Sequence, residues 1–529
     1  MKLLQITLAL LLAHFAVAVE KPNILVILTD DLGYSDLGCF GAEVDTPNLD
    51  RLADNGLRMS QFYNTAKCHS SRVSLLTGRW CIQAGDIDMN KAVTIPEVLA
   101  PAGYFTAMSG KWHLAKQPTD FGFQRYWGHL SGASNFYKGN KTFRLNGNKW
   151  NVPKKDFYTT TAMADFSLKF IAEAREENKP WFLYLAYNAP HAPLQPLKED
   201  YEKYRDRYTA GWDQLNLARF ERQKKLGVIP ADLERSPRPD HIPAWDSLTP
   251  ELKEWESKRM AALAAMIEAV DRETGRIIAD LETNGELDNT LIIFLSDNGA
   301  CPYDRPGVHR DREPYLPSTR WSDSTGWAWA RNTPFRYYKQ NQYEGGISGP
   351  AIFHWPAGIT AEKGSITDTP AHLVDLLPTL AEVGGAEIPT TFPDRQPTPL
   401  AGTSITPVLV GKPMESRPPI HLLFEQDRGL RDGDWKIVSL RGNSWELYHI
   451  PTDRSELNNL AAKHPDRVAE MAAKWTEITK QTMGINPKSV APKTSARNHH
   501  EYSNYAGKHG ATTSPAVIRK IERNKQPTD

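Results

Sequence analysis

Residues 23–28 read Asn-Ile-Leu-Val-Ile-Leu, an uninterrupted apolar run that is rich in β-branched side chains. A strand with one face in water would alternate apolar and polar residues, and this run does not alternate. We therefore expect a strand that is buried on both faces, as in a parallel sheet covered by helices on both sides. The next signal, Thr46-Pro47-Asn48, predicts a helix start with Thr46 as the N-cap and Pro47 as the first helical residue.

Further strand and helix signals alternate along the chain. Residues 104–108, 181–187 and 291–295 predict three more buried strands, and residues 251–283 carry apolar side chains at helical spacing. Strands that alternate with helices predict an α/β fold built on a large, mainly parallel, doubly wound sheet flanked by helices.

Polar residues follow the predicted strands directly. Asp30-Asp31 comes after the first strand and Asp297-Asn298 after the strand at 291–295, while Lys111, His113 and His191 follow the other two. Ligands of open α/β sheets bind beyond the carboxyl ends of the strands, so we expect these side chains to share one rim. Asp30, Asp31, Asp297 and Asn298 offer only oxygen atoms, which suits Ca²⁺ or Mg²⁺ better than Zn²⁺. Taken alone, Asp30-Asp31 is also compatible with a simple turn.

Cys68 begins a segment that predicts a helix, with Arg72 one turn further along the same face. A nucleophile at a helix N-terminus lies in a positive field that favours anions. The alternative is a buried and inert cysteine, which is common for isolated cysteines.

With these residues in these positions, the sequence resembles the sulfatase family. Residues 68–79 read Cys-His-Ser-Ser-Arg-Val-Ser-Leu-Leu-Thr-Gly-Arg and match the family's Cys-x-Ser/Pro/Ala-x-Arg modification signature with its extension. Residues 110–114 (Gly-Lys-Trp-His-Leu) match the second signature, except that Ala115 replaces the usual glycine. The remaining matches are Asp30–Tyr34, Asn188–Pro193, Lys339 with Glu344-Gly345-Gly346, Asp434–Lys436, Glu446–Tyr448 and Asp453–Leu460.

The resemblance implies a sulfatase whose Cys68 is oxidised to formylglycine by a maturation enzyme. The hydrated aldehyde would attack sulfur through one hydroxyl and expel sulfate through the second. Ca²⁺ would be held by Asp30, Asp31, Asp297, Asn298 and the modified Cys68. Further catalytic positions implied by the family are Arg72, Lys111, His113, His191 and Lys339.

The resemblance also implies individual roles. Arg72 would orient the nucleophile, and Lys111 and Lys339 would bind sulfate oxygens. Lys339 could instead be a solvated charge. His113 is expected to be the base that triggers release of sulfate, and His191 the acid that protonates the leaving alcohol, although the two roles could be exchanged.

Two other functions remain open at this stage. The first is a phosphate or phosphonate monoester hydrolase of the same superfamily, which is alkaline-phosphatase-like. The second is a catalytically dead relative that binds glycans. The sequence favours a sulfate ester of a carbohydrate or an aryl sulfate as substrate, without naming it.

The N-terminus predicts a secretory signal peptide. Lys2 precedes an apolar run that ends in Ala16-Val17-Ala18, a small-x-small cleavage site. The run is short for a membrane anchor, so we expect a secreted or periplasmic protein without a stable anchor. Lys+Arg and Asp+Glu are equal at 63 each, which gives no global attraction to nucleic acid. The four cysteines are too few for a disulfide framework, and bridges among Cys39, Cys81 and Cys301 stay open.

The predicted elements and the composition along the sequence divide the chain into four parts. We expect a signal peptide at 1–18, an N-terminal α/β catalytic domain at 19–415, a small C-terminal subdomain with an antiparallel sheet and a helix at 416–485, and a polar, poorly ordered or loosely docked tail at 486–529. Residues 201–250 and 302–341 are interpreted as insertions that shape a substrate cleft or form irregular surface loops. The second contains Trp321, Trp327 and Trp329, which could stack on sugar rings or pack on the core.

Overall fold

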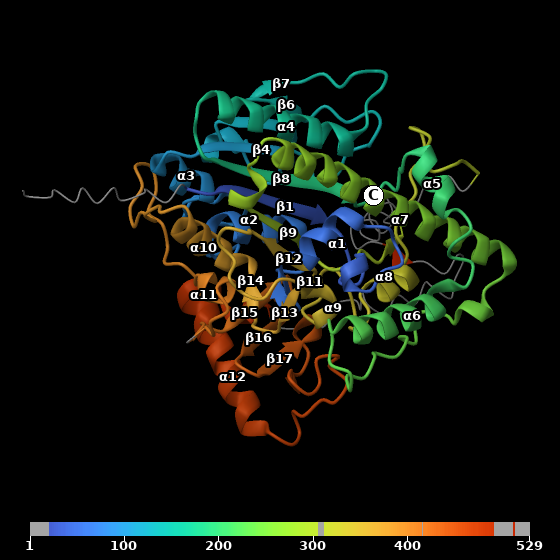
Figure 1. Cartoon of the computed structure of the whole chain (residues 1–529). Helices are drawn as coiled ribbons and strands as arrows, with labels where there is room; N and C mark the ends of the chain where they lie inside the picture. The colour runs from blue at the N-terminus through green and yellow to red at the C-terminus, as the bar shows by residue number, and fades with distance from the viewer. Residues whose placement is uncertain (1–20, 305–310, 415, 491–511, 514–529) are drawn as a thin grey trace, which may run out of the picture.

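The structure, a computed structural model, describes residues 21–304, 311–414, 416–490 and 512–513. Its centre is a ten-stranded sheet (Figure 1). The strands follow in the order β13 (Ser365–Thr367), β2 (Leu57–Met59), β12 (Ala351–His354), β9 (Thr290–Ser296), β1 (Asn23–Asp30), β8 (Trp181–Pro190), β4 (Phe105–Lys111), β5 (Arg125–His129), β6 (Phe143–Leu145) and β7 (Asn148–Lys149). The five central strands, from β9 to β5, are parallel to one another, and antiparallel strands flank them. The predicted α/β fold with a mainly parallel sheet is confirmed.

Helices cover both faces of the sheet, and β1 shows why its sequence has no alternation. Leu25 and Ile27 pack with one core cluster, whereas Ile24, Val26 and Leu28 pack with a second cluster on the opposite face. The first face is covered by α1 (Pro47–Asp54), α4 (Thr159–Glu176) and α7 (Pro250–Thr283). The second face is covered by α2 (Cys68–Thr77), α3 (Ile95–Leu99), α10 (Leu376–Val383) and α11 (Thr406–Leu409).

The start of α1 differs from the prediction in how its first amides are satisfied. Thr46 is the N-cap residue and Pro47 begins the helix, as predicted, but the Thr46 side chain makes no capping hydrogen bond. Its hydroxyl instead accepts from the amide of Gly38 and donates to Asp50. The free amides of Asn48 and Leu49 are satisfied by the Asp271 carboxylate from α7, so a tertiary contact replaces the local cap.

Both predicted insertions contain helices and pack against the core. The first contains α5 (Lys198–Tyr204) and α6 (Gly211–Leu226), and the second contains α8 (Thr325–Arg331), followed by α9 (Glu344–Ile347). Trp321, Trp327 and Trp329 are buried to 2% exposure or less, and the Trp327 ring packs edge-on against Trp212 of α6. These tryptophans therefore belong to the core, and the alternative that they stack on sugars is wrong.

A separate four-stranded antiparallel sheet lies at the C-terminal end of the described chain, below the large sheet in Figure 1. It consists of β15 (Ile420–Phe424), β16 (Asp427–Asp432), β17 (Trp435–Ser439) and β18 (Glu446–His449), and α12 (Pro465–Glu477) packs on it. Its own core contains Leu430, Ile437, Leu447, Met471 and Trp475. Two minor sheets join β11 (Ser348–Gly349), β3 (Phe62–Tyr63) and β14 (Ala371–His372), and β10 (Tyr303–Asp304) with β19 (Thr512–Thr513). The exact domain limits stay predictions.

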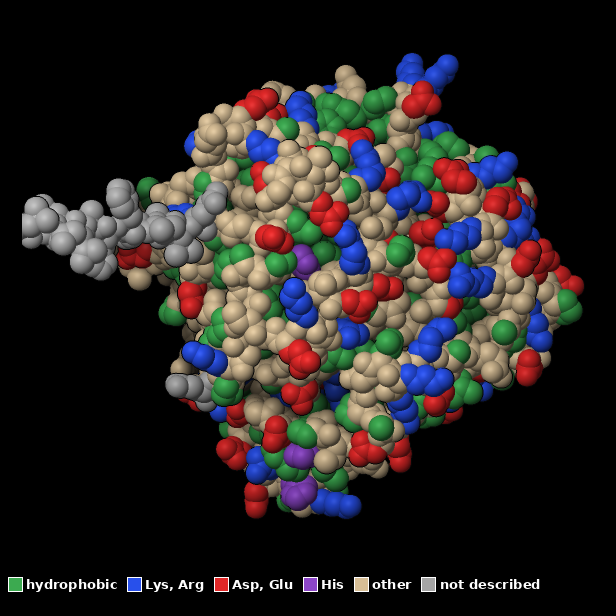
Figure 2. Space-filling view, viewed as in Figure 1, with side chains coloured by type: hydrophobic (Ala, Val, Ile, Leu, Met, Phe, Trp, Pro, Cys, Tyr) green, Lys and Arg blue, Asp and Glu red, His purple; other side chains and the backbone are tan. Residues whose placement is uncertain are grey.

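The predicted signal peptide and most of the predicted tail lie outside the described residues. Within the described part of the chain, every helix is too short or too polar to cross a bilayer. All four cysteines are free thiols. Basic and acidic side chains are interspersed over the face shown in Figure 2.

Candidate active site

Four oxygen-bearing side chains meet where β1 and β9 end. Asp30 is the last residue of β1, Asp31 follows it, and Asp297 and Asn298 follow Ser296 at the end of β9. Because the two strands are parallel neighbours, their carboxyl ends lie side by side. The Asp31 amide donates to Oδ1 of Asp297 at 3.2 Å, and Nδ2 of Asn298 donates to Oδ1 of Asp31 at 2.6 Å.

This cluster is chemically incomplete without a cation. All four side chains are fully buried, yet Oδ1 of Asp30, Oδ2 of Asp31 and Oδ1 of Asn298 have no hydrogen-bond partner among the described residues. Asp30, Cys68 and Asp297 place one potential ligand atom each within 4.8 Å of one another. Buried polar atoms without partners are strongly unfavourable, and a hard divalent cation would satisfy these oxygens. The donor set therefore fits a metal ion of the Ca²⁺ or Mg²⁺ type.

The pKa values of the carboxyls reflect the crowding of negative charge. Burial works against ionisation of Asp30, but Lys111, His191 and Arg72 outweigh it and hold its pKa well below the usual range. Burial and the nearby charge of Asp30 instead raise the pKa of Asp297 well above its usual range. A bound cation favours the ionised form of every carboxyl around it, so it would lower the pKa of Asp297 as well.

Cys68 is the first residue of α2 and is almost completely buried beside the oxygen cluster. Burial by itself raises the pKa of its thiol, but the ammonium groups of Lys339, Lys111 and Lys67 together lower that pKa to about 6. One turn later, Arg72 donates from Nη1 to the carbonyl of Lys111 and from Nη2 to Asp297, both at 2.9 Å.

Two lysines form ion pairs with carboxylates of the cluster. Lys111 ends β4, and its Nζ lies 2.5 Å from Oδ2 of Asp30. Lys339 lies between α8 and α9 and forms an ion pair with Asp31. Both side chains are buried, so the alternative that Lys339 is a solvated charge is wrong. Each ammonium lies against a carboxylate of the cluster.

The two histidines stand at the ends of neighbouring strands. His191 follows β8; its Nδ1 lies 2.6 Å from the carbonyl of Ala192, and its Nε2 lies 3.7 Å from Oδ2 of Asp31. His113 follows β4 in a left-handed conformation with φ of 59°, and its Nδ1 has no hydrogen-bond partner among the described residues. Burial lowers the pKa of His191 to about 4, and burial with Lys111 and Arg72 lowers that of His113 to about 2. Both imidazoles are therefore neutral near pH 7.

The structure thus brings together every predicted site residue: Asp30, Asp31, Cys68, Arg72, Lys111, His113, His191, Asp297, Asn298 and Lys339. Two neighbours were not predicted. Lys67 is one of the cations that lower the pKa of Cys68, and the His69 ring lies 6.0 Å from that of His113. Their positions beside Cys68 were the only signal in the sequence.

Comparison with known proteins gives the family of this arrangement. A family model described as Sulfatase matches residues 22–386. The chain belongs to the sulfatase family. An uncharacterized sulfatase of Schizosaccharomyces pombe is 34% identical, over 88% of this chain and 94% of its own. The arylsulfatase of Klebsiella aerogenes is 31% identical over 74% of this chain and 93% of its own.

The fold is also that of solved sulfatase structures. BT4656, solved with its substrate D-glucosamine-2-N,6-O-disulfate, has a TM-score of 0.63 and 24% identity, and the match covers 88% of this chain and 99% of that one. Sulfatases generally use a metal ion and a formylglycine, and the acidic cluster beside Cys68 fits that general pattern. This chain is accordingly a sulfatase enzyme.

Proposed function

We propose that this sulfatase hydrolyses sulfate esters of carbohydrates or aryl alcohols with Ca²⁺ and with a formylglycine formed from Cys68. The observation that carries the proposal is the cluster of buried oxygens without partners next to the thiol of Cys68, ringed by Arg72, Lys111 and Lys339. The cluster offers a cation its ligands, and the three basic side chains offer an anion its counter-charges.

Asp30, Asp31, Asp297 and Asn298 would hold Ca²⁺, together with the modified Cys68. The ion would supply Lewis-acid chemistry: it lowers the pKa of a bound hydroxyl and neutralises a sulfate oxygen. One hydroxyl of the formylglycine hydrate would attack sulfur and displace the alcohol, which breaks the ester S–O bond. Deprotonation of the second hydroxyl would then expel sulfate and restore the aldehyde.

The basic residues would bind the sulfate group. Arg72 is fixed by Asp297 and by the Lys111 carbonyl, so its guanidinium can orient the nucleophile without further reorganisation. The ammonium groups of Lys111 and Lys339 face Asp30 and Asp31. With those carboxylates neutralised by the cation, both would be available to sulfate oxygens as charge develops in the transition state.

His113 and His191 would move the protons. Nδ1 of His191 contacts a main-chain carbonyl, which fixes the proton on that nitrogen and leaves Nε2 facing the cluster. To act as the acid, His191 would carry a second proton on Nε2 and donate it to the leaving alcohol. His113 would act as the base that triggers release of sulfate.

The proposed substrate class rests on the relatives, and the proposed location rests on the N-terminal sequence. The relatives include an arylsulfatase, and a protein of the same fold binds D-glucosamine-2-N,6-O-disulfate, which supports aryl or carbohydrate sulfates. The N-terminal apolar run supports secretion or a periplasmic location, and a maturation enzyme would convert Cys68 before or during export.

The first test is the mass of the peptide that carries Cys68, after co-expression with a formylglycine-generating enzyme. An aldehyde that a hydrazine reagent traps would support the nucleophile. An unmodified thiol, under conditions where a known substrate peptide is converted, would rule the mechanism out.

The second test compares p-nitrophenyl sulfate with p-nitrophenyl phosphate on the converted enzyme. We expect faster turnover of the sulfate ester and its loss in C68A. Faster turnover of the phosphate ester would assign the chain to the phosphate or phosphonate hydrolases of the superfamily. If C68A kept the full biological activity of the protein, that activity would not depend on catalysis at Cys68, which would favour the glycan-binding alternative.

A further inference from the structure

A buried arginine contacts the main chain of Asp31. Arg331 is the last residue of α8, has no exposed surface, and donates from Nη2 to the main-chain carbonyl of Asp31 at 2.8 Å. Asp31 has a left-handed conformation with φ of 71°, which residues other than glycine rarely adopt. A contact to its carbonyl fixes the peptide that follows, and so holds this unfavourable conformation and the direction of the side chain.

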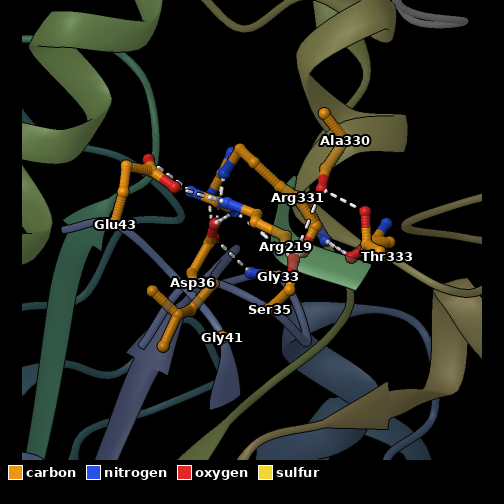
Figure 3. Close-up of polar contacts among 12 residues, drawn as sticks. Gly33, Ser35, Asp36, Gly41, Glu43, Arg219, Ala330, Arg331 and Thr333 are labelled. Atoms are coloured by element: carbon orange, nitrogen blue, oxygen red, sulfur yellow. Dashed lines mark hydrogen bonds and ion pairs between the residues drawn. The ribbon is translucent and has the colours of Figure 1, made fainter. Parts of the chain in front are cut away.

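Arg331 is itself held by Asp36. Its Nε lies 2.9 Å and its Nη2 2.8 Å from Oδ2 of Asp36, and the same carboxylate oxygen accepts from the amide of Gly33 at 2.7 Å. The carbonyl of Arg331 in turn accepts from the amide and the hydroxyl of Ser35. The turn from Asp31 to Asp36 is therefore bound at several points to the C-terminal end of α8 (Figure 3).

A second arginine completes the charge balance behind this turn. Arg219 of α6 donates to Oδ1 of Asp36 at 2.8 Å and forms two parallel hydrogen bonds, each 2.9 Å, with Glu43. Figure 3 shows Asp36 between the two guanidinium groups, with Glu43 on the far side of Arg219. Arg331 also lies 3.6 Å from Asp323, and Arg222 lies 3.3 Å from Glu43. Three arginines and three carboxylates give no net charge, so Arg331 can stay buried without opposing a cation at Asp31.

The residue after Arg331 reaches the second oxygen-bearing loop. Oδ1 of Asn332 accepts from the amide of Ala300 at 3.0 Å, and its Nδ2 donates to the carbonyl of Tyr337 at 3.1 Å. Ala300 lies two residues after Asn298, and its own carbonyl accepts from the amide of Lys339. Consecutive residues at the end of α8 thus contact both loops that carry the candidate ligands.

We propose that Arg331 and Asn332 are positioning residues of the metal site, Arg331 for the Asp31 carboxylate and Asn332 for the Asp297-Asn298 pair. The inference rests on the proposed metal site and adds to it residues that touch neither metal nor substrate. Outer contacts of this kind orient the side chains that bind a metal and strongly affect its affinity.

The test measures Ca²⁺ affinity by isothermal titration calorimetry on the full mature chain after chelator treatment. R331K keeps the charge that Asp36 needs, but lysine is shorter and lacks the Nε–H that now holds Asp36, so its ammonium cannot reproduce the contacts to Asp36 and to the Asp31 carbonyl together. N332A removes the contact to the second loop without changing charge. The matched control is R395K, because Arg395 also joins a carboxylate, Glu97, to a main-chain carbonyl, that of Ala92, with no partner in the site.

We expect the dissociation constant for Ca²⁺ to rise about 10- to 100-fold in R331K and in N332A, and to stay unchanged in R395K. Excess Ca²⁺ should restore both the thermal stabilisation by the ion and the turnover of p-nitrophenyl sulfate in the two variants. Folded R331K and N332A with wild-type affinity would overturn the inference, as would failure of both to fold, because the residues would then serve the whole fold. A wild-type chain that binds no Ca²⁺ would instead contradict the proposed function.

Discussion

Nη2 of Arg72 lies 2.9 Å from Oδ2 of Asp297, and both side chains are buried. Arg72 belongs to the helix that begins with Cys68, whereas Asp297 follows the end of β9. This ion pair therefore fixes the thiol-bearing helix against the oxygen cluster. Oδ1 of Asp30 lies 3.9 Å from the same guanidinium nitrogen, so two of the three acidic side chains share one arginine.

The first prediction concerns metal removal. Chelation should lower the melting temperature, and Ca²⁺ at about 100 times its dissociation constant should stabilise the chain by about 2.7 kcal/mol. D297N should lose most of this effect, because it removes a ligand charge. Differential scanning calorimetry with and without Ca²⁺ measures both.

The matched control for D297N is D246N, since the Asp246 side chain is 99% exposed. It should keep the full stabilisation by Ca²⁺. A wild-type melting temperature that responds neither to chelator nor to Ca²⁺ would contradict the metal assignment.

The second prediction separates the two histidines. If His191 protonates the leaving alcohol, H191A should lower turnover of alkyl or sugar sulfates by about 100- to 10,000-fold. It should affect p-nitrophenyl sulfate much less, because nitrophenolate leaves without a proton. H113A should lower turnover of both substrates. Steady-state kinetics with paired substrates gives the result, and the opposite pattern would exchange the two roles.

Much of the fold could be predicted because it depends on local patterns. Residues 23–28, 181–187 and 291–295 are apolar without alternation, since strands in the middle of this sheet face helices on both sides. Polar residues after such strands had to gather at one edge, because β1, β9, β8 and β4 run in the same direction. The closeness of Asp30, Lys111 and Asp297 followed from that rule alone.

Other features depend on contacts between distant parts of the chain. Lys339 pairs with Asp31 across 308 residues, and Arg331 reaches the same turn across 300. The polar composition of residues 201–250 suggested loops, yet α6 is a helix whose buried Arg219 pairs with Asp36 and Glu43. Local propensity carries no information about such partners, so the network behind Asp31 could not be predicted.

The third prediction concerns the unmodified thiol. The ammonium groups of Lys339, Lys111 and Lys67 outweigh burial and lower the pKa of Cys68 to about 6. In metal-free protein without formylglycine, alkylation of Cys68 by iodoacetamide should therefore rise with pH and reach half its maximum near that value. K339M should move the midpoint upward. Peptide mass spectrometry over a pH series follows the reaction.

Cys39 and Cys81 provide the internal control. Burial raises the pKa of both thiols well above the usual range, so their peptides should react only in strongly alkaline solution. A Cys68 midpoint near the usual cysteine value of about 8.5 would show that the lysines do not act on this sulfur.

The fourth prediction concerns the contact between the small sheet and the rest of the chain. Nζ of Lys436, on β17, lies 2.9 Å from Glu344 and 2.7 Å from Glu456, and all three side chains are buried. K436M would leave the buried Glu456 without its cation and Glu344 paired with Arg454 alone, which should destabilise the protein by about 3–5 kcal/mol. K474M, which breaks an exposed pair with Asp432, should cost less than about 1 kcal/mol. Urea unfolding compares the two, and equal losses would contradict the role of burial.

The buried group of Lys436, Glu344 and Glu456 also predicts how the free energy of unfolding depends on pH. Burial, opposed by Lys436 and reinforced by the charge of Glu344, raises the pKa of Glu456 to about 7. Between the unfolded value of about 4.3 and that pKa, the folded state holds a proton that the unfolded state releases. The contribution of Glu456 to stability is therefore complete below about pH 4 and is lost as the pH rises through 7. E456Q should remove this slope, and urea unfolding of wild type and E456Q at several pH values measures it. A wild-type slope that survives in E456Q would assign the proton to another group.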